Sequence, residues 1–286
     1  MWNFLKNITY SDYDVTTERK SILKELVKEV ENNLKKDNDN VHSEVSDTVG
    51  QSSSENWKRE RTLRITASNC KSISHYGSLI SEDKLNEKKL KTITELIKNK
   101  LWMSNDIQTS AMKYGQAEEP KARKNYAEAT KYQVEETGLW IHNEFPFVGA
   151  SPDGLIMNDQ KPIGVLEIKC LQILKESSVE DLIKRSKTEQ IAKMSAQCFK
   201  IIDEKLTLKK ESAYFSQVLL QMLVTGLKFC DFVLHSPKGP PSIERIYEDV
   251  AIQNTLVQNI KVFWERALIP EYFEKRLPRN LPLLIL

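Results

Sequence analysis

Residues 149–170 read GASPDGLIMNDQKPIGVLEIKC, and we take this stretch as the centre of the fold. Two β-prone runs flank a polar turn at 158–162, which predicts a β-hairpin. Side chains two positions apart on a strand lie on the same face. Glu167 and Lys169 are therefore expected to share one face of the second strand with Val165, while Leu166 and Ile168 lie on the other.

A glutamate and a lysine on an apolar strand need an explanation, because burying an unpaired ion is costly. The simplest is a half-exposed ion pair between Glu167 and Lys169. The hairpin, however, also brings Asp153 beside Glu167, and neighbouring carboxylates repel unless a cation lies between them. Mg²⁺ prefers carboxylate and carbonyl oxygens, so Asp153, Glu167 and the backbone carbonyl of Ile168 form a candidate metal site. Lys169 is then positioned to hold or polarise the attacking water.

At these residues the sequence resembles a known family. Asp153 followed by Glu167-Ile168-Lys169 matches the D…(D/E)xK signature of the PD-(D/E)XK nuclease superfamily. The longer wording, SPDGL…LEIKC, is similar to its YqaJ branch, the viral-recombinase or lambda-type alkaline exonucleases. The resemblance implies an α/β fold of the restriction-endonuclease-like type, with a central mixed β-sheet flanked by helices.

A second motif lies upstream, where the basic run 57–64, WKRERTLR, leads directly into Ile-Thr-Ala-Ser. A basic run is most often a solvated helix face, but arginine forks beside hydroxyl groups also suit a phosphate. Lambda-type exonucleases have a W…R…ITAS segment whose Arg and Ser bind the 5′-phosphate of DNA, and Arg61 and Ser68 match these positions. Arg64 also fits the wording, so the resemblance leaves open which arginine holds the phosphate. Ser151 is expected to contact phosphate oxygens as well.

Two predicted helices complete the site. Residues 110–130 match a family helix of the form G…E..A…(F/Y), which supplies a further acid to the metal. Glu119 has the matching spacing and Glu118 is the alternative, since adjacent helix positions point about 100° apart. Gln217 and Gln221 lie one turn apart on an apolar helix and read most simply as half-exposed amides. By resemblance, Gln217 contacts DNA or the metal-bound water.

Composition sets limits on the class of protein. The chain has 286 residues, of which 40% are hydrophobic and 29% charged, as in ordinary soluble globular proteins. Its net charge of +2 does not by itself indicate nucleic-acid binding, which must rest on local patches. The four cysteines and four histidines are dispersed without metal-ligand spacing. Because no segment reads as a secretory signal or a membrane span, we expect an intracellular protein of the cytoplasm or nucleus.

The chain is predicted to have two parts. Residues 17–36 carry apolar side chains at helical spacing, which predicts an amphipathic helix. The polar, serine-rich run 37–56 reads as a flexible linker. We therefore divide the chain into 1–56, the helix and linker, and 57–286, the nuclease domain. The polar region that follows Cys170 is expected to hold short helical pieces and a mobile loop. Further elements are expected as helices at 82–102 and 251–275 and strands at 229–234 and 243–247.

The function predicted from these motifs is metal-dependent hydrolysis of phosphodiester bonds in DNA, 5′ to 3′ from duplex ends. Mg²⁺ is the expected cofactor, and Mn²⁺ is expected to substitute for it. The expected partner is DNA, while a single-strand annealing or recombination partner and a homo-oligomer stay open. An endonuclease or RNA nuclease of the same superfamily is one alternative, and a catalytically idle DNA-binding module is another. The intact Asp153, Glu167 and Lys169 argue against the idle module.

Overall fold

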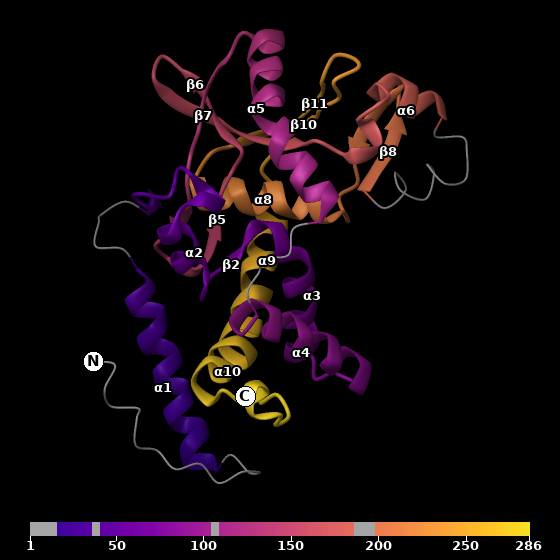
Figure 1. The fold of residues 1–286 in the computed structure, drawn as a ribbon. Coiled ribbons are helices and arrows are strands. Elements are labelled where there is room, and N and C mark those ends of the chain that lie inside the picture. Colours follow the sequence, from indigo (N-terminus) through magenta and orange to yellow (C-terminus); the bar gives the residue numbers. More distant parts are fainter. Residues whose placement is uncertain (1–15, 36–40, 104–108, 186–197) are drawn as a thin grey trace.

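The structure is a computed structural model that describes residues 16–35, 41–103, 109–185 and 198–286 (Figure 1). Its centre is a five-stranded sheet of order β11-β10-β7-β6-β3. The strands are β3 (Gln133–Glu135), β6 (Gly154–Asn158), β7 (Lys161–Lys169), β10 (Phe229–Leu234) and β11 (Ser242–Tyr247). β10 pairs parallel with β7, whereas the other neighbours pair antiparallel, so the sheet is mixed. The predicted α/β fold with a central mixed sheet is confirmed.

The predicted hairpin is formed by β6 and β7. Its turn is tighter than expected, because Asn158 already pairs with Lys161 and only Asp159 and Gln160 lie between the strands. Both turn residues have positive φ, 47° and 64°, which is the conformation that two-residue hairpins favour.

The side chains of β7 alternate between two hydrophobic clusters. Val165 packs in the cluster that includes residues of α8 (Ala213–Thr225), and Glu167 bonds to the same helix. Leu166 and Ile168 pack in the cluster that includes residues of α5 (Ser110–Thr130). The predicted division of faces is confirmed, and the two helices cover opposite faces of the central strand.

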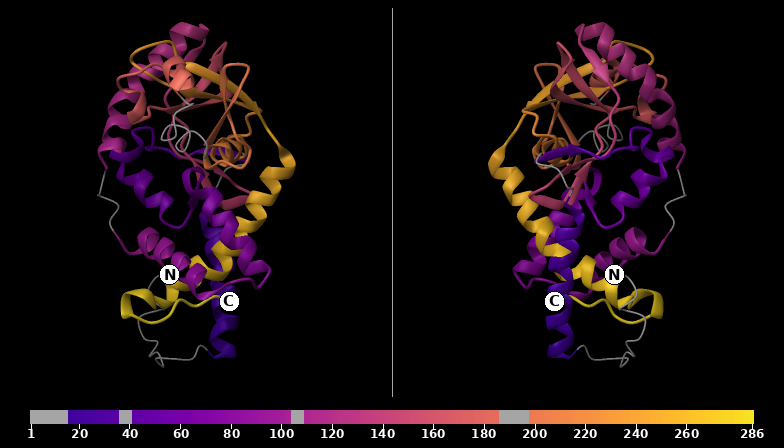
Figure 2. Two further views of the ribbon diagram at one scale, coloured as in Figure 1. Left: turned by 90° about the vertical axis from the view of Figure 1, so that its right-hand side faces the viewer. Right: turned by 90° about the vertical axis from the view of Figure 1, so that its left-hand side faces the viewer.

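The remaining helices are α1 (Thr17–Leu34), α2 (Glu55–Arg61), α3 (Cys70–Ser81), α4 (Glu87–Leu101), α6 (Val179–Arg185), α9 (Val250–Phe263) and α10 (Ile269–Glu274). Of these, α1, α4 and α9 correspond to the helices predicted at 17–36, 82–102 and 251–275. A π-helical segment, Trp264–Leu268, joins α9 to α10 inside the predicted closing helix. Figures 1 and 2 show α1, α4, α9 and α10 gathered below the sheet, on the opposite end of the molecule from α5. No helix in the described ranges is long and apolar enough to cross a membrane.

The prediction of a flexible linker is wrong for residues 41–56. β1 (His42–Glu44) pairs antiparallel with β4 (Trp140–His142), and this pair belongs to a second sheet of order β1-β4-β5-β2. The other strands of that sheet are β5 (Phe145–Ala150) and β2 (Ile65–Thr66). Thr48 is fully buried, and its hydroxyl accepts a hydrogen bond from the backbone N–H of Leu139. Polar side chains that look solvated in sequence are here ordered by contacts with distant backbone.

The region after Cys170 also differs from the prediction. The short helix α6 is present, but β8 (Phe199–Ile202) and β9 (Lys205–Leu208) then form an antiparallel hairpin where a loop was expected. Phe199, Leu206 and Leu208 are buried in the cluster of α8. Residues 186–197 of the predicted mobile loop lie outside the described residues.

Candidate active site

Asp153 lies immediately before β6, beside the C-terminal part of β7. Its Oδ2 accepts a 2.6 Å hydrogen bond from the backbone N–H of Ile168, which fixes the carboxylate against the strand. Burial, together with the nearby negative charge of Glu167, raises the pKa of Asp153 well above its usual range. The hairpin therefore brings the two carboxylates together, as the sequence analysis expected.

Glu167 is only 1% exposed and has three polar partners. Gln217 and Gln221 of α8 each donate to one of its carboxylate oxygens at 2.6 Å, and the Lys169 ammonium donates to Oε1. The two amides of α8 can thus bind the same carboxylate because they are one helical turn apart. The structure brings Gln217 to Glu167, while its contact with DNA or the metal-bound water stays a prediction. Gln221 was not predicted as a site residue, although its i, i+4 spacing from Gln217 was the available signal.

Lys169 binds Glu167 and lies within electrostatic reach of Asp153. Burial alone favours the neutral amine, but Glu167 and Asp153 outweigh it and raise the pKa of the Lys169 ammonium above its usual value. The side chain also lies over the ring of Tyr214, with 5.1 Å between Nζ and the ring centroid. Lys169 is therefore charged at neutral pH in this arrangement.

Glu119 approaches the hairpin from α5. Burial raises the pKa of this carboxyl group, with Glu167 adding to the effect and Arg123 opposing it, so Glu119 lies within electrostatic reach of the buried acids. Arg123 binds Glu119 at 2.8 Å through Nη2 and the backbone carbonyl of Asp153 at 2.9 Å through Nε. This arginine joins α5 to the start of β6. No feature of the sequence analysis singled it out.

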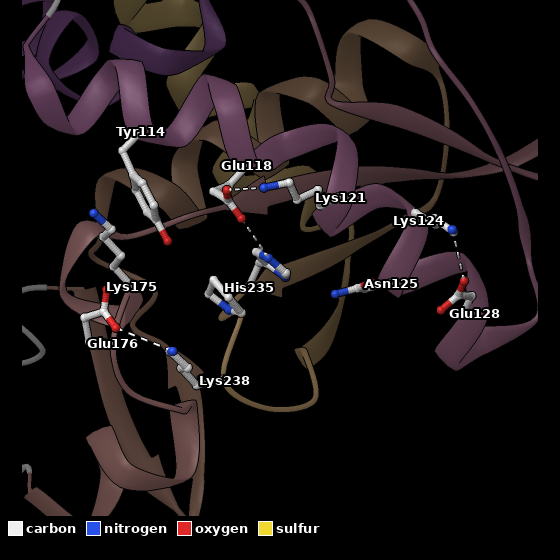
Figure 3. Close-up of a pocket in the computed structure, with 11 residues that line it drawn as sticks. Tyr114, Glu118, Lys121, Lys124, Asn125, Glu128, Lys175, Glu176, His235 and Lys238 are labelled. Atoms are coloured by element: carbon white, nitrogen blue, oxygen red, sulfur yellow. Dashed lines mark hydrogen bonds and ion pairs between the residues drawn. The ribbon is translucent and has the colours of Figure 1, made fainter.

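The alternative acid, Glu118, lies on another face of α5. It lines a cavity of about 600 Å³ and pairs there with Lys121 at 2.7 Å and with His235 at 3.8 Å (Figure 3). Other lysines of this cavity are also paired with its glutamates, Lys124 with Glu128 and Lys238 with Glu176. Because its charges are largely balanced internally, the cavity offers little excess positive charge for a phosphate.

The carboxylates can be tested as ligands for a divalent cation. In the described part of the chain, no three His, Cys, Asp or Glu side chains form a ready-made metal-binding group. Glu119 pairs with Arg123 and Glu167 with Lys169 instead. The chemistry of the donors fits Mg²⁺, because all are oxygens and because burial, together with repulsion from Glu167 and Glu119, raises the pKa of Asp153. A hard cation would relieve that repulsion.

A separate cluster forms around Arg61, at the end of α2. The Arg61 guanidinium stacks on the Trp57 ring, 3.5 Å from its centroid, and reaches the Thr66 hydroxyl at 3.4 Å. That hydroxyl lies 3.4 Å from the Ser68 hydroxyl, and the Trp57 indole donates to Ser151 Oγ at 2.8 Å. Burial lowers the pKa of Arg61 to about 10. The structure thus brings Arg61 and Ser68, from one short stretch of chain, together with the distant Ser151.

Arg64 is placed differently. It is 1% exposed, and its guanidinium donates to the Glu60 carboxylate and to the backbone carbonyls of Leu34 and Pro146. All three nitrogens are therefore engaged inside the protein. Of the two candidate arginines, the structure brings only Arg61 to the hydroxyl groups.

A further network, which the sequence analysis missed, joins α5 to the sheet. The hydroxyl of Tyr126 donates to Asp231 Oδ2 at 2.6 Å, and Arg245 binds both oxygens of the same carboxylate at 2.7 and 2.8 Å. Asp231 is 1% exposed, so these bonds satisfy a buried charge. The network fixes the helix that carries Glu119.

The fold and the site define a class, the nucleases of the restriction-endonuclease-like fold, in which a hairpin presents two carboxylates and a lysine between flanking helices. A family profile described as the YqaJ-like viral recombinase domain matches residues 56–228, and the chain belongs to this family. The assignment made from sequence is confirmed, and the protein is a nuclease of the exonuclease type. The match begins near the predicted domain boundary, although the division of the chain there stays a prediction.

Two solved structures of an alkaline exonuclease, LHK-Exo from Laribacter hongkongensis, resemble the chain, one of them a complex with dAMP. Each is 26% identical, covers 79% of this chain and 97% of that one, and superimposes with a TM-score of 0.53. A phage-related exonuclease from Haemophilus somnus 129PT is 14% identical, covers 76% of this chain and 96% of that one, and has a TM-score of 0.48. A search of curated proteins finds no match to this sequence.

Proposed function

We propose that the protein degrades DNA from duplex ends in the 5′ to 3′ direction, with Mg²⁺ as the cofactor and Mn²⁺ as a substitute. The observation that carries this proposal is the pairing of two sites, Asp153, Glu167 and Lys169 on one hairpin and the Arg61 cluster upstream. The first suits hydrolysis of a phosphodiester, and the second suits a phosphate at the end of a strand. Membership of the viral-recombinase family supports DNA as the substrate.

Asp153, Glu167 and Glu119, with the backbone carbonyl of Ile168, are the residues that would hold the cation. When bound, a divalent cation lowers the pKa of a ligated water and stabilises the oxyanion that leaves. Gln217 donates to Glu167 and orients that carboxylate. Because the raised pKa of Lys169 keeps it protonated, we assign it to orienting the attacking water and the scissile phosphate, not to accepting a proton.

Phosphate oxygens would be held by Arg61, Ser68 and Ser151. Arginine offers several N–H donors in a planar fork, and its bonds to a phosphate are charge-assisted. Arg64 is assigned to packing, because its donors already bind Glu60 and two backbone carbonyls.

DNA ends are the proposed partner, together with a single-strand annealing or recombination protein and further copies of the chain. Such a substrate implies an intracellular location, in the cytoplasm or nucleus. We further propose residues 57–286 as the nuclease domain. Residues 41–56 pack against that domain as a strand and a short helical segment.

The proposal is tested with purified protein and three DNA substrates in Mg²⁺: linear duplex with a 5′-phosphate, the same duplex with a 5′-hydroxyl, and a closed circle. We expect rapid loss of the phosphorylated duplex from its 5′ ends, slower loss of the hydroxyl form, an intact circle and no reaction in EDTA. Cutting of the circle as fast as the linear duplex would favour the endonuclease alternative. The idle-module alternative predicts binding without hydrolysis in every reaction.

A further inference from the structure

Lys100, in the last turn of α4, lies against the Arg61 cluster. Its ammonium donates a 3.0 Å hydrogen bond to the backbone carbonyl of Arg61, a residue 39 positions earlier in the chain. Burial, with a contribution from the positive charge of Arg61, lowers the pKa of Lys100 to about 7. Two half-buried basic groups therefore lie close together, and each disfavours the charged form of the other.

Neither cation has an internal counter-ion. Within the described ranges, no carboxylate pairs with Lys100 or Arg61, although most other half-buried basic side chains around the site have one, such as Arg123 and Lys169. The Arg61 guanidinium instead faces the Trp57 ring and a hydroxyl group. Two neighbouring cations without an anion destabilise a fold, because repulsion adds to the cost of desolvation. The arrangement is favourable once an external anion binds between or beside them.

The number of cations indicates which phosphate would bind. An internal phosphodiester carries one negative charge, whereas a phosphate monoester carries about 1.5 to 2 negative charges at neutral pH. Arg61 alone balances a diester. Arg61 and Lys100, the latter in the protonated form that a nearby anion favours, together balance a monoester, the group found at a phosphorylated strand end.

We infer that Lys100 is a specificity-determining residue, which with Arg61 selects a terminal 5′-phosphate over a 5′-hydroxyl or an internal phosphodiester. This inference rests on the proposed exonuclease function and names the residue that makes it end-specific. It also gives a role to the last turn of α4, whose lysine binds the backbone carbonyl of Arg61.

The test compares Lys100→Met, Lys100→Arg and the control Lys98→Met, a neighbouring lysine whose side chain is exposed. For each protein, initial rates are measured on 5′-phosphorylated and 5′-hydroxyl duplexes in Mg²⁺, and end preference is the ratio of the two. Loss of one charge-assisted contact should reduce the preference of Lys100→Met by about tenfold, mainly through slower reaction of the phosphorylated duplex. Lys98→Met should keep the wild-type ratio, and Lys100→Arg should keep most of it.

Stability provides the second measurement. Lys100→Met removes an uncompensated charge, so its melting temperature should equal or exceed that of the wild type. A purely structural lysine would show the opposite pattern, with lower stability and an unchanged end preference, and this result would overturn the inference. Equal losses of preference in Lys100→Arg and Lys100→Met would also overturn it, because charge would not be the cause. If the wild type degraded neither duplex, the proposed function itself would fail; full wild-type preference in Lys100→Met would reject only the role of Lys100.

Discussion

At the β6–β7 hairpin the charged groups have partners within the protein, since Glu167 binds Lys169 and two amides and Asp153 binds a backbone N–H. Around Arg61 the charges are of one sign, and the described residues provide hydroxyl groups and an aromatic ring but no carboxylate partner. The first region can hold its geometry before any ligand arrives. The second gains its counter-charge only from a ligand, so we expect mutations there to change substrate choice more than the chemical step.

The largest effect should come from the first region. Glu167→Ala and Lys169→Ala should each abolish cleavage, by at least about 10²–10⁴-fold, because they remove a metal ligand and the group that orients the water. Cleavage of 5′-phosphorylated duplex in Mg²⁺ is the measurement, and circular dichroism checks the fold. Near wild-type turnover in either variant would show that the hairpin is not the catalytic centre.

Substitutions of Arg64 and Arg61 distinguish a residue that stabilises the fold from one that recognises phosphate. Arg64→Met should lower the free energy of unfolding by about 3 kcal/mol, because Glu60 and two backbone carbonyls lose their donor inside the protein. Urea denaturation measures this change. The ratio of rates on 5′-phosphorylated and 5′-hydroxyl ends should stay at the wild-type value in the folded fraction, and a collapse of that ratio would assign Arg64 to the phosphate after all.

Arg61→Ala should give the complementary result. Loss of a charge-assisted contact worth about 1.5 to 3 kcal/mol slows reaction of 5′-phosphorylated duplex by about tenfold to a hundredfold. The 5′-hydroxyl duplex should react at nearly the wild-type rate, because it lacks the charge that Arg61 binds. Equal slowing of both substrates would contradict a role in end recognition.

A smaller effect is expected at the network behind Glu119. Tyr126→Phe removes one donor from the buried Asp231 carboxylate, which keeps both of its bonds to Arg245. We expect a loss of about 1 kcal/mol in the free energy of unfolding and little change in cleavage rate. A large loss of activity at unchanged stability would instead indicate that this tyrosine helps to position α5 for catalysis.

A further effect concerns pH and stability. The pKa of Lys100 is lowered to about 7 in the folded protein, whereas an unfolded lysine titrates near about 10.4. Between these values the unfolded chain binds more protons, so this residue's contribution to stability rises with pH and its cost is full below pH 7. When the pH is raised from 7 to 9, the urea midpoint of the wild type should therefore rise more, or fall less, than that of Lys100→Met. Parallel changes in the two proteins would contradict the lowered pKa.

Much of the fold could be predicted because its signals are local. Alternation around Glu167 and Lys169 predicted the faces of β7, helical spacing predicted α1 and α4, and the family resemblance added α5. The prediction of a linker was wrong because the polar composition of this segment is typical of a solvated chain. Its order comes from pairing between His42–Glu44 and a strand about a hundred residues away. The β8–β9 hairpin was missed because lysines mask a short apolar pattern.

The amino-acid sequence by itself determined the hairpin, the carboxylates and lysine on it, and the family, since these depend on residue type and on spacing along a short stretch. Only the tertiary structure decided which arginine faces the hydroxyl groups, which acid of α5 points to the hairpin, and that Lys100 lies beside Arg61. Arg61 and Arg64 are equivalent in a basic run, and packing distinguishes them by burying one among carbonyl groups. Such choices depend on contacts between segments tens of residues apart, for which spacing along the chain carries no signal.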